Sequence, residues 1–155
     1  LLIFLNDVHA LGLATAQGLV LTETFYWDMN EGTRRFTQRV VPHMGGNYPC
    51  MTHAGCYSAV LHYLKTVQAM GGGVAAKADG AATVARMKSM PTEDECFGRG
   101  TIRADGRHLV NSYLFEVKRP EESSRPWDYY KLLQTTPADD AFRPMAEGNC
   151  PIVRG

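Results

Sequence analysis

A long amphipathic helix is the strongest structural signal in the sequence, and it follows the turn at Asn47-Tyr48-Pro49. Gly71-Gly72-Gly73 is expected to end it, because consecutive glycines disfavour a continued helix. One stripe of this helix recurs at helical spacing and is expected to face the core. The stripe comprises Ala54, Tyr57, Leu61, Leu64 and Gln68, with Val60 and Val67 beside it.

Strand and helix patterns alternate on both sides of this helix. The apolar run from Leu1 to Leu5 has the length of a strand buried on both faces, and polar residues follow its end. Asp28 or Asn30 can cap the helix that follows the second strand, and an Asp-Gly pair within 98–107 predicts a hairpin. We therefore expect an α/β layered fold. The predicted strands are 1–5, 19–26 and 113–117, and the predicted helices are 31–44 and 79–90.

The C-terminal tail is punctuated by prolines and is predicted to be mostly extended, with short turns. It carries one aromatic cluster, formed by Trp127, Tyr129 and Tyr130.

Composition and charge narrow the functional classes. The chain has 155 residues, so one domain is the default. Sixteen basic residues balance sixteen acidic ones, which argues against a nucleic-acid binder or a polybasic membrane anchor. The run Leu1 to Leu5 is much shorter than the roughly 18 to 20 residues of a membrane span. Residues 1–33 contain no Lys or Arg, so no secretory signal is predicted there, and the abrupt apolar start suggests a fragment of a longer protein.

The four cysteines have spacings that invite two interpretations. Cys50, His53 and Cys56 resemble a metal-ligand spacing, but on a helix these positions spread over about 120° instead of converging. We therefore expect Cys50 and Cys56 to be small buried hydrophobic residues and expect no metal. Cys96 and Cys150 lie in loop-like segments, where either could form a disulfide in an oxidising compartment. The sequence does not choose among the possible pairings.

Catalytic and nucleotide-binding patterns are weak. A nucleophile and base could come from Cys56 or Ser58 with His53 or His62, which would have to lie within about 3.2 Å of each other. No activating turn such as Gly-x-Ser-x-Gly surrounds them, so helix-face residues are the favoured interpretation. The triple glycine follows a helix instead of opening one, which argues against a phosphate-binding loop.

Polar residues near predicted element ends form the candidate binding site. Asn6, Asp7 and His9 follow the first predicted strand, where open α/β sheets place their ligands. Thr52 and His53 stand at the start of the long helix, where free backbone N–H groups favour an anion. Aromatic residues at the exit of the second strand, Phe25, Tyr26 and Trp27, could wall the site. The alternative is that Asp7 only caps a turn and that His53 is solvated.

The order of these segments closely resembles the C-terminal part of the substrate-binding proteins of branched-chain amino-acid-type ABC transporters. That family has the type I periplasmic binding fold, in which two Rossmann-like α/β lobes close on a ligand. The resemblance covers essentially the whole chain. It is carried by Leu5-Asn6-Asp7, by Gly-Leu-Val-Leu-Thr-Glu-x-Phe-Tyr-Trp-Asp at 18–28, by 54–60, by 100–107, by 113–118, by Trp127-Asp128-Tyr129-Tyr130-Lys131 and by Ala141-Phe142-Arg143-Pro144.

The resemblance implies a division of the chain between the lobes. Residues 1–25 would belong to the second lobe, 26–112 mainly to the first, and 113–155 to a crossing strand and the second-lobe tail. The N-terminal part of the fold would be missing.

By the same resemblance, Asn6, Asp7 and His9 would reach an amino group or polar substituent of the ligand. Thr52 and His53 would line the first-lobe side, with Phe25 or Tyr26 as a wall near the hinge. The sequence departs from the family in two respects. Cys50 and Cys56 stand at positions where ordinary polar or apolar residues are expected, and the acidic contact typical of amino-acid binders does not align unambiguously with Asp7.

The resulting hypothesis is a non-enzymatic periplasmic solute receptor without a cofactor. Its ligand would be an amino acid or a small aromatic carboxylate, and its partner would be an ABC transporter membrane permease. One rival is a ligand-sensing regulatory domain of the same fold, and another is a small hydrolase that uses Cys56 or Ser58.

Overall fold

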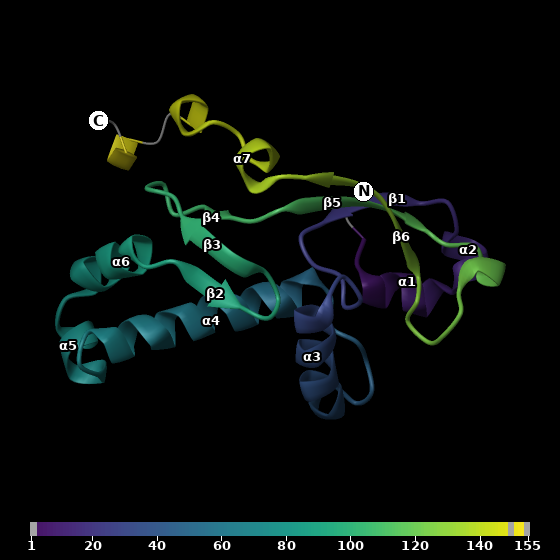
Figure 1. Cartoon of the computed structure of the whole chain (residues 1–155), viewed down its shortest axis with the longest axis horizontal. Helices are drawn as coiled ribbons and strands as arrows, with labels where there is room; N and C mark the ends of the chain where they lie inside the picture. Colours follow the sequence, from purple (N-terminus) through teal and green to yellow (C-terminus); the bar gives the residue numbers. More distant parts are fainter. Residues whose placement is uncertain (1–2, 149–150, 154–155) are drawn as a thin grey trace.

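The structure is a computed structural model that describes residues 3–148 and 151–153. Figure 1 shows two bodies, one around the long helix α4 and the other around the strands β1, β5 and β6. The helices are α1 (Leu5–Leu11), α2 (Leu13–Ala16), α3 (Glu31–Val40), α4 (Met51–Ala69), α5 (Gly73–Ala78), α6 (Gly80–Ser89) and α7 (Ala138–Ala141). The strands are β1 (Val20–Glu23), β2 (Thr92–Asp94), β3 (Gly98–Ile102), β4 (His108–Leu109), β5 (Ser112–Val117) and β6 (Tyr130–Thr136). Short 3-10 turns include η1 (Val41–His43).

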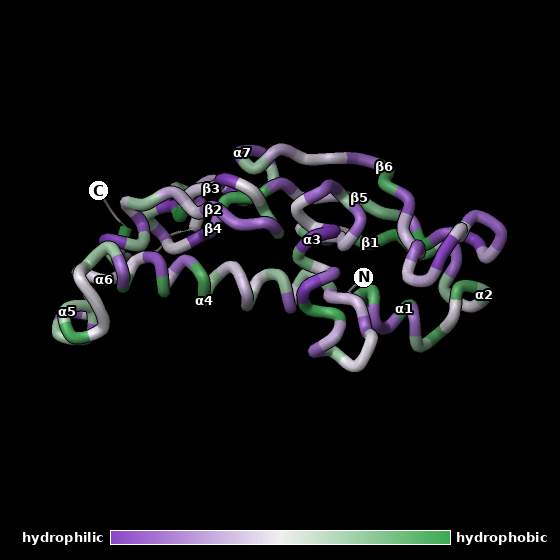
Figure 2. Tube along the Cα trace, turned by 60° about the horizontal axis from the view of Figure 1, so that its bottom comes forward, coloured by the Kyte–Doolittle hydropathy of each residue, from purple (hydrophilic) through white to green (hydrophobic). Residues whose placement is uncertain are grey.

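The first sheet has the order β1-β5-β6, with both pairs antiparallel. Leu21 pairs with Phe115, and both side chains are buried. Figure 2 shows hydrophobic stretches where β1 and β5 lie side by side. Phe25 and Phe36 pack edge to face at 5.8 Å between ring centroids, which joins α3 to this core. The predicted strand 113–117 is confirmed over its whole length, and the predicted strand 19–26 is confirmed over residues 20–23.

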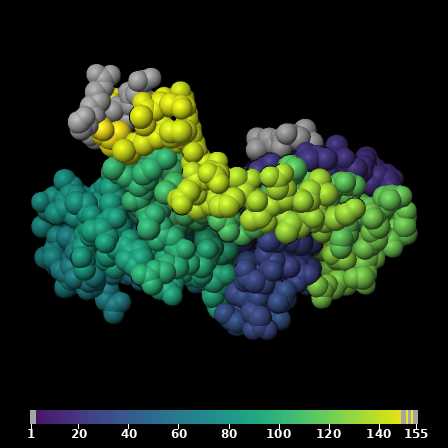
Figure 3. All heavy atoms as spheres, turned by 45° about the horizontal axis from the view of Figure 1, so that its top comes forward, coloured from purple at the N-terminus to yellow at the C-terminus, as the bar shows by residue number. Residues whose placement is uncertain are grey.

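The second sheet, β2-β3-β4, is also antiparallel and packs on α4 and α6. The predicted hairpin at 98–107 is confirmed: Ile102 pairs with His108. Gly106 in the connecting loop has φ 87°, a left-handed conformation that glycine adopts without a Cβ clash. Figure 3 shows the stretch after β6 extending towards this body across the visible face, and α7 contacts β4.

The predicted first strand is wrong where the structure describes it, because Leu5 begins the helix α1. Leu1 and Leu2 lie outside the described residues. The Asp7 carboxylate accepts the backbone N–H of Phe4 at 2.8 Å, which caps the first turn. Leu5 and Val8 lie three residues apart on one buried helix face. Leu5 and the polar residues after it thus belong to one amphipathic helix.

The long helix α4 is confirmed, but its predicted core stripe is wrong. The buried stripe is Ala54, Ser58, His62 and Thr66, with a spacing of four residues. Leu64 instead has an exposed fraction of 54%. The buried polar groups have hydrogen-bond partners, so their burial carries no unpaired-group penalty. Ser58 donates to Asp94, His62 bonds to the Met87 carbonyl, and the Thr66 hydroxyl donates to the His62 carbonyl.

The remaining helices follow their sequence signals closely. The Asn30 side chain accepts the backbone N–H of Thr33 at 3.1 Å and caps α3. Asp79 caps α6 in the same way through Ala82, at 2.9 Å. The glycine run ends α4 as predicted, but Gly73 also begins the unpredicted helix α5. None of the helices in the described part of the chain is long and apolar enough to cross a membrane.

Candidate functional site

A hollow of about 590 Å³ lies between the start of α1 and the start of α4. The amide nitrogen of Asn6 donates to the carbonyl of Tyr48 at 3.1 Å, which ties its two sides together. The structure thus brings together four of the predicted ligand-binding residues. Asn6 and Asp7 lie more than forty positions before Thr52 and His53 in the sequence. The hollow is lined by Phe4, Asn6, Asp7, Met44, Asn47, Cys50, Thr52 and His53.

The α4 side of the hollow presents donor groups. Thr52 and His53 are the second and third residues of α4, a 19-residue helix whose N-terminus is electropositive. The backbone N–H of Cys50 donates to His53 Nδ1 at 3.2 Å. Because Nδ1 accepts this hydrogen bond, Nε2 is the ring nitrogen of His53 that can donate to a ligand. Cys50 Sγ lies 3.0 Å from Thr52 Oγ1 and is 3% exposed.

The α1 side of the hollow presents acceptor groups. Asn6 Oδ1 is buried and has no hydrogen-bond partner among the residues that the structure describes. A buried acceptor without a partner destabilises a protein unless a ligand or water supplies the donor. Asp7 lies beside it on the same helix, with one carboxylate oxygen bonded to the Phe4 N–H. This side of the hollow therefore suits a group that donates hydrogen bonds or carries positive charge.

A buried acid lies behind the α4 side. Glu23, the last residue of β1, is 1% exposed and accepts a hydrogen bond from the Tyr130 hydroxyl at 3.1 Å. The backbone N–H of Met51, the first residue of α4, also bonds to this carboxyl group. Burial raises the pKa of Glu23 to about 7, against the lowering effect of these two hydrogen bonds. Glu23 is thus an acid that titrates near neutral pH next to the hollow.

The three other predicted site residues lie elsewhere. Phe25 and Tyr26 are buried in the core, at 1% and 5% exposure, and do not line this hollow. His9 lies further along α1, where its ring stacks on Trp127 at 3.9 Å between centroids. Its Nδ1 is 2.7 Å from the hydroxyl of Tyr129.

Sequence reasoning missed Glu23, Met44 and Asn47. Their positions gave no motif, because Glu23 stands within a strand pattern and the other two stand in a connecting loop.

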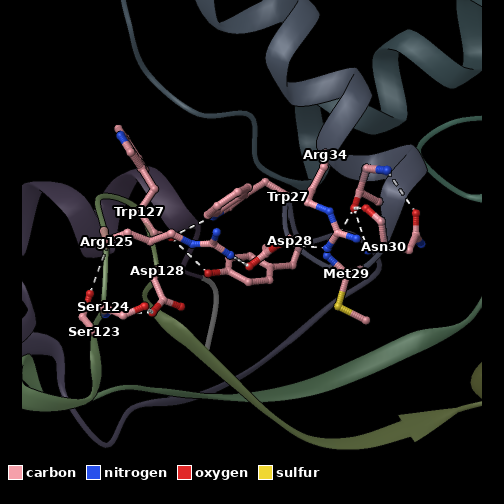
Figure 4. Close-up of polar contacts among 12 residues, drawn as sticks. Trp27, Asp28, Met29, Asn30, Arg34, Ser123, Ser124, Arg125, Trp127 and Asp128 are labelled. Carbon is pink, nitrogen blue, oxygen red and sulfur yellow. Dashed lines mark hydrogen bonds and ion pairs between the residues drawn. The ribbon is translucent and has the colours of Figure 1, made fainter.

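The predicted aromatic cluster of the tail anchors the strap formed by residues 119–128. The carbonyl of Trp127 accepts two buried hydrogen bonds, from the Tyr26 hydroxyl at 3.0 Å and from Trp27 Nε1 at 2.8 Å. Figure 4 shows this strap beside the loop that precedes α3, with the ring of Trp27 between them.

Acidic residues secure the strap from both sides. Asp28 forms ion pairs with Arg125 of the strap and, at 3.0 Å, with Arg34 of α3 (Figure 4). Asp128 accepts from Lys118 at 2.6 Å and from the backbone N–H of Ser124 at 3.0 Å. These contacts tie the strap to the loop before α3, to α3 itself and to the residue that follows β5.

The candidate nucleophiles do not pair with the candidate bases. Ser58 Oγ donates to Asp94 at 2.5 Å, and His62 Nε2 bonds to the Met87 carbonyl at 2.9 Å. Cys56 is exposed, so its predicted burial is wrong, because residue 56 lies off the buried stripe of α4. Among the described residues, neither Cys56 nor Ser58 therefore has the histidine partner that the hydrolase alternative requires.

The cysteines carry little further information. Cys50 is buried, as predicted, and Cys96 is a buried thiol. Cys150 lies outside the described residues, and with it any disulfide that it would form. Across residues 3–148 and 151–153, no three His, Cys, Asp or Glu side chains gather as a metal site.

Solved structures of the same architecture are ligand-binding proteins. A periplasmic binding protein from Burkholderia mallei is 42% identical, with a TM-score of 0.89 over 99% of this chain and 39% of that chain. A branched chain amino acid ABC transporter periplasmic ligand-binding protein from Burkholderia xenovorans LB400 is 36% identical, with a TM-score of 0.84 over 96% and 38%. An amino acid ABC transporter substrate-binding protein from Pseudomonas fluorescens Pf-5 shares the fold, at 20% identity and a TM-score of 0.78 over 94% and 37%. Comparison with curated proteins gave no match.

These structures define the class of the chain as part of a two-lobed type I binding fold. Residues 1–124 match the family described as periplasmic binding protein, and the chain belongs to that family. The predicted resemblance and fold class are confirmed. The chain spans about two fifths of the length of the solved structures, as their coverage of 39% and 38% indicates.

Proposed function

We propose that the chain forms part of the ligand cleft of a periplasmic solute receptor that serves an ABC transporter permease. The observation that carries this proposal is the hollow with donors on one side and acceptors on the other. Thr52 and His53 stand at the electropositive start of α4, while Asn6 Oδ1 lacks a partner on α1. Such a site needs only to bind and release its ligand, and no chemical step is required.

The polarity of the hollow favours a zwitterionic amino acid over a simple acid. A ligand carboxylate would lie at the α4 N-terminus, where the helix dipole and the Thr52 hydroxyl stabilise negative charge. An ammonium group would lie against Asn6 and Asp7, which offer oxygen acceptors. A small aromatic carboxylate is the alternative ligand, and it would leave the Asn6 acceptor unpaired.

The proposed lobe division suggests how ligand binding at this hollow would close the two lobes. Residues 1–25 and 113–155 are assigned to the second lobe and 26–112 mainly to the first, so Asn6 and Thr52 would belong to different lobes. A ligand that contacts both would stabilise the closed form, because only differential affinity shifts such an equilibrium. The rest of both lobes would come from the N-terminal part of the same protein, and the permease would recognise the closed form. The neutral net charge gives no reason to expect a nucleic-acid partner.

A ligand series tests the proposal in the full-length receptor. Leucine, its deaminated analogue 4-methylpentanoate, its decarboxylated analogue isopentylamine, and benzoate would be compared by calorimetry and thermal shift. We expect leucine-type zwitterions to bind, and each truncated analogue to bind at least about tenfold more weakly. Benzoate as the tightest ligand would transfer the assignment to aromatic acids, and failure of all amino acids and aromatic acids would refute the receptor.

A matched pair of variants links binding to the hollow. Asn6→Ala removes the unpartnered acceptor and should weaken leucine binding by about tenfold or more. Asn111→Ala makes the same change outside the hollow, where Asn111 bonds to the Ala138 N–H, and should leave the Kd unchanged. Equal effects of the two substitutions would argue against this location.

A further inference from the structure

Glu23 joins three elements next to the candidate ligand hollow. Its carboxyl group is bonded to Tyr130 of β6 and to the backbone N–H of Met51 in α4, while Glu23 itself ends β1. Met51 lies between Cys50 and Thr52, two residues that line the hollow. The carboxyl group is therefore one residue away from the ligand-facing surface, yet it is 1% exposed.

The charges around Glu23 leave it without a counter-ion. Tyr130 and the Met51 N–H donate hydrogen bonds, and the Asp7 carboxylate of α1 adds repulsion that disfavours a second negative charge. Cys50, a further titratable group, acts on Tyr130 from the start of α4. No Lys or Arg among the described residues forms an ion pair with Glu23. Burial without a counter-ion favours the neutral acid, in agreement with a pKa of about 7.

An ionised Glu23 would compete with a ligand anion for the same helix end. The first N–H of α4 is already committed to the Glu23 carboxyl group, and the next two residues, Thr52 and His53, face the hollow. Two negative charges at one helix N-terminus repel each other strongly in a poorly solvated site. A neutral Glu23 can still accept the Met51 hydrogen bond through its carbonyl oxygen, and it removes this repulsion.

We propose that Glu23 determines ligand affinity by taking up a proton from solvent when an anionic group binds at the start of α4. This inference rests on the proposed receptor function and adds a pH dependence to it. Binding of the anion favours the neutral acid, and by linkage the neutral acid favours binding. If a bound ligand raises the pKa of Glu23 by one unit, the Kd at high pH is ten times the Kd at low pH.

Calorimetry of the full-length receptor with leucine and with benzoate as probes tests the inference. For the probe that binds, we expect the Kd to rise about tenfold between about pH 6 and about pH 8.5. Near neutral pH, titrations in phosphate and in Tris should differ in observed enthalpy by the amount that proton uptake requires. Glu23→Gln should bind with the acidic-limit Kd at every pH and without proton uptake. Glu116→Gln, a matched change on β5, should keep the wild-type profile.

A second variant guards against loss of folding in Glu23→Gln. Tyr130→Phe removes a hydrogen bond that lowers the Glu23 pKa, so the midpoint of the Kd profile should move to higher pH. An unmoved midpoint, a pH profile that survives Glu23→Gln, or binding without proton uptake would overturn the inference and leave the receptor function standing. Failure of both probes to bind at any pH would overturn both.

Discussion

Removal of the Tyr26 hydroxyl tests whether buried hydrogen bonds hold the strap 119–128 in place. It donates to the Trp127 carbonyl at 3.0 Å and accepts the backbone N–H of Tyr129 at 3.2 Å, and Tyr26 is 5% exposed. Tyr26→Phe keeps the ring and removes both bonds. The Trp127 carbonyl retains its bond from Trp27, so the lost donor alone contributes about 1 kcal/mol. The Tyr129 N–H loses its bond to the Tyr26 hydroxyl but keeps the Trp127 carbonyl as an acceptor at 3.0 Å, so this loss adds no more than about 1 kcal/mol.

The expected total is a decrease of about 1 to 2 kcal/mol in the free energy of unfolding. Urea unfolding of the full-length protein, followed by tryptophan fluorescence, would measure it, with an unchanged m-value as the sign of unchanged two-state behaviour. Tyr129→Phe is the matched control, because its hydroxyl makes an exposed bond to His9 and should contribute no more than about 0.5 kcal/mol. Equal losses in the two variants, or a loss below about 0.5 kcal/mol in Tyr26→Phe, would refute the reasoning.

Four further predictions concern stability and exposure. Asp128→Asn should destabilise the protein by about 2 kcal/mol at neutral pH. Burial alone would raise the pKa of this carboxyl group, but its lysine and serine partners lower it, so the difference in urea unfolding should shrink as the pH falls through the lowered pKa of Asp128. Gly100→Ala would place a Cβ within 2.9 Å of a threonine oxygen and should lower thermal stability by about 1 to 3 kcal/mol, whereas Gly55→Ala meets open space in α4 and should raise it by up to about 1 kcal/mol. Wild-type stability should fall by about 3 kcal/mol as the pH rises from about 4.5 to about 7, because the folded state holds the Glu23 proton longer than the unfolded state, and Glu23→Gln should abolish this fall. Cys56 is exposed and should react with Ellman's reagent in the native protein, and protection of this thiol until unfolding would contradict the orientation of α4.

Local signals predicted the ends of helices better than their faces. The caps Asn30 and Asp79 act through side chains next to the helices that they begin, so the sequence contains the whole interaction. The face of α4 depends on partners far along the chain, since Ser58 bonds to Asp94 and His62 lies against α6. No local rule assigns a serine or histidine to the inside when its partner is not known. Apolar spacing therefore chose Leu64 for the core, although the structure exposes it.

The sequence predicted those residues of the candidate site that are polar and stand at the start of a helix. Thr52 and His53 were found because they follow a turn and open a long helix, and Asn6 was found through its place after an apolar run. The interpretation of that run as a strand was wrong, yet the residues at its end still reach the hollow. Glu23 could not be found in this way, because its burial depends on packing against β6 and α4, which lie far away in the sequence.

The strap explains how two walls from distant segments keep one geometry. The Trp127 ring stacks on His9 of α1 at 3.9 Å and on Tyr48, which precedes α4, at 5.3 Å. Trp127 also has φ 65°, a conformation that side chains larger than glycine rarely adopt. Its stacking and the two side-chain hydrogen bonds to its carbonyl offset that strain. Any separation of α1 from the start of α4 has to slide or break this stack. We therefore expect the fluorescence of Trp127, which contacts both sides, to change when a ligand moves α1 relative to the start of α4.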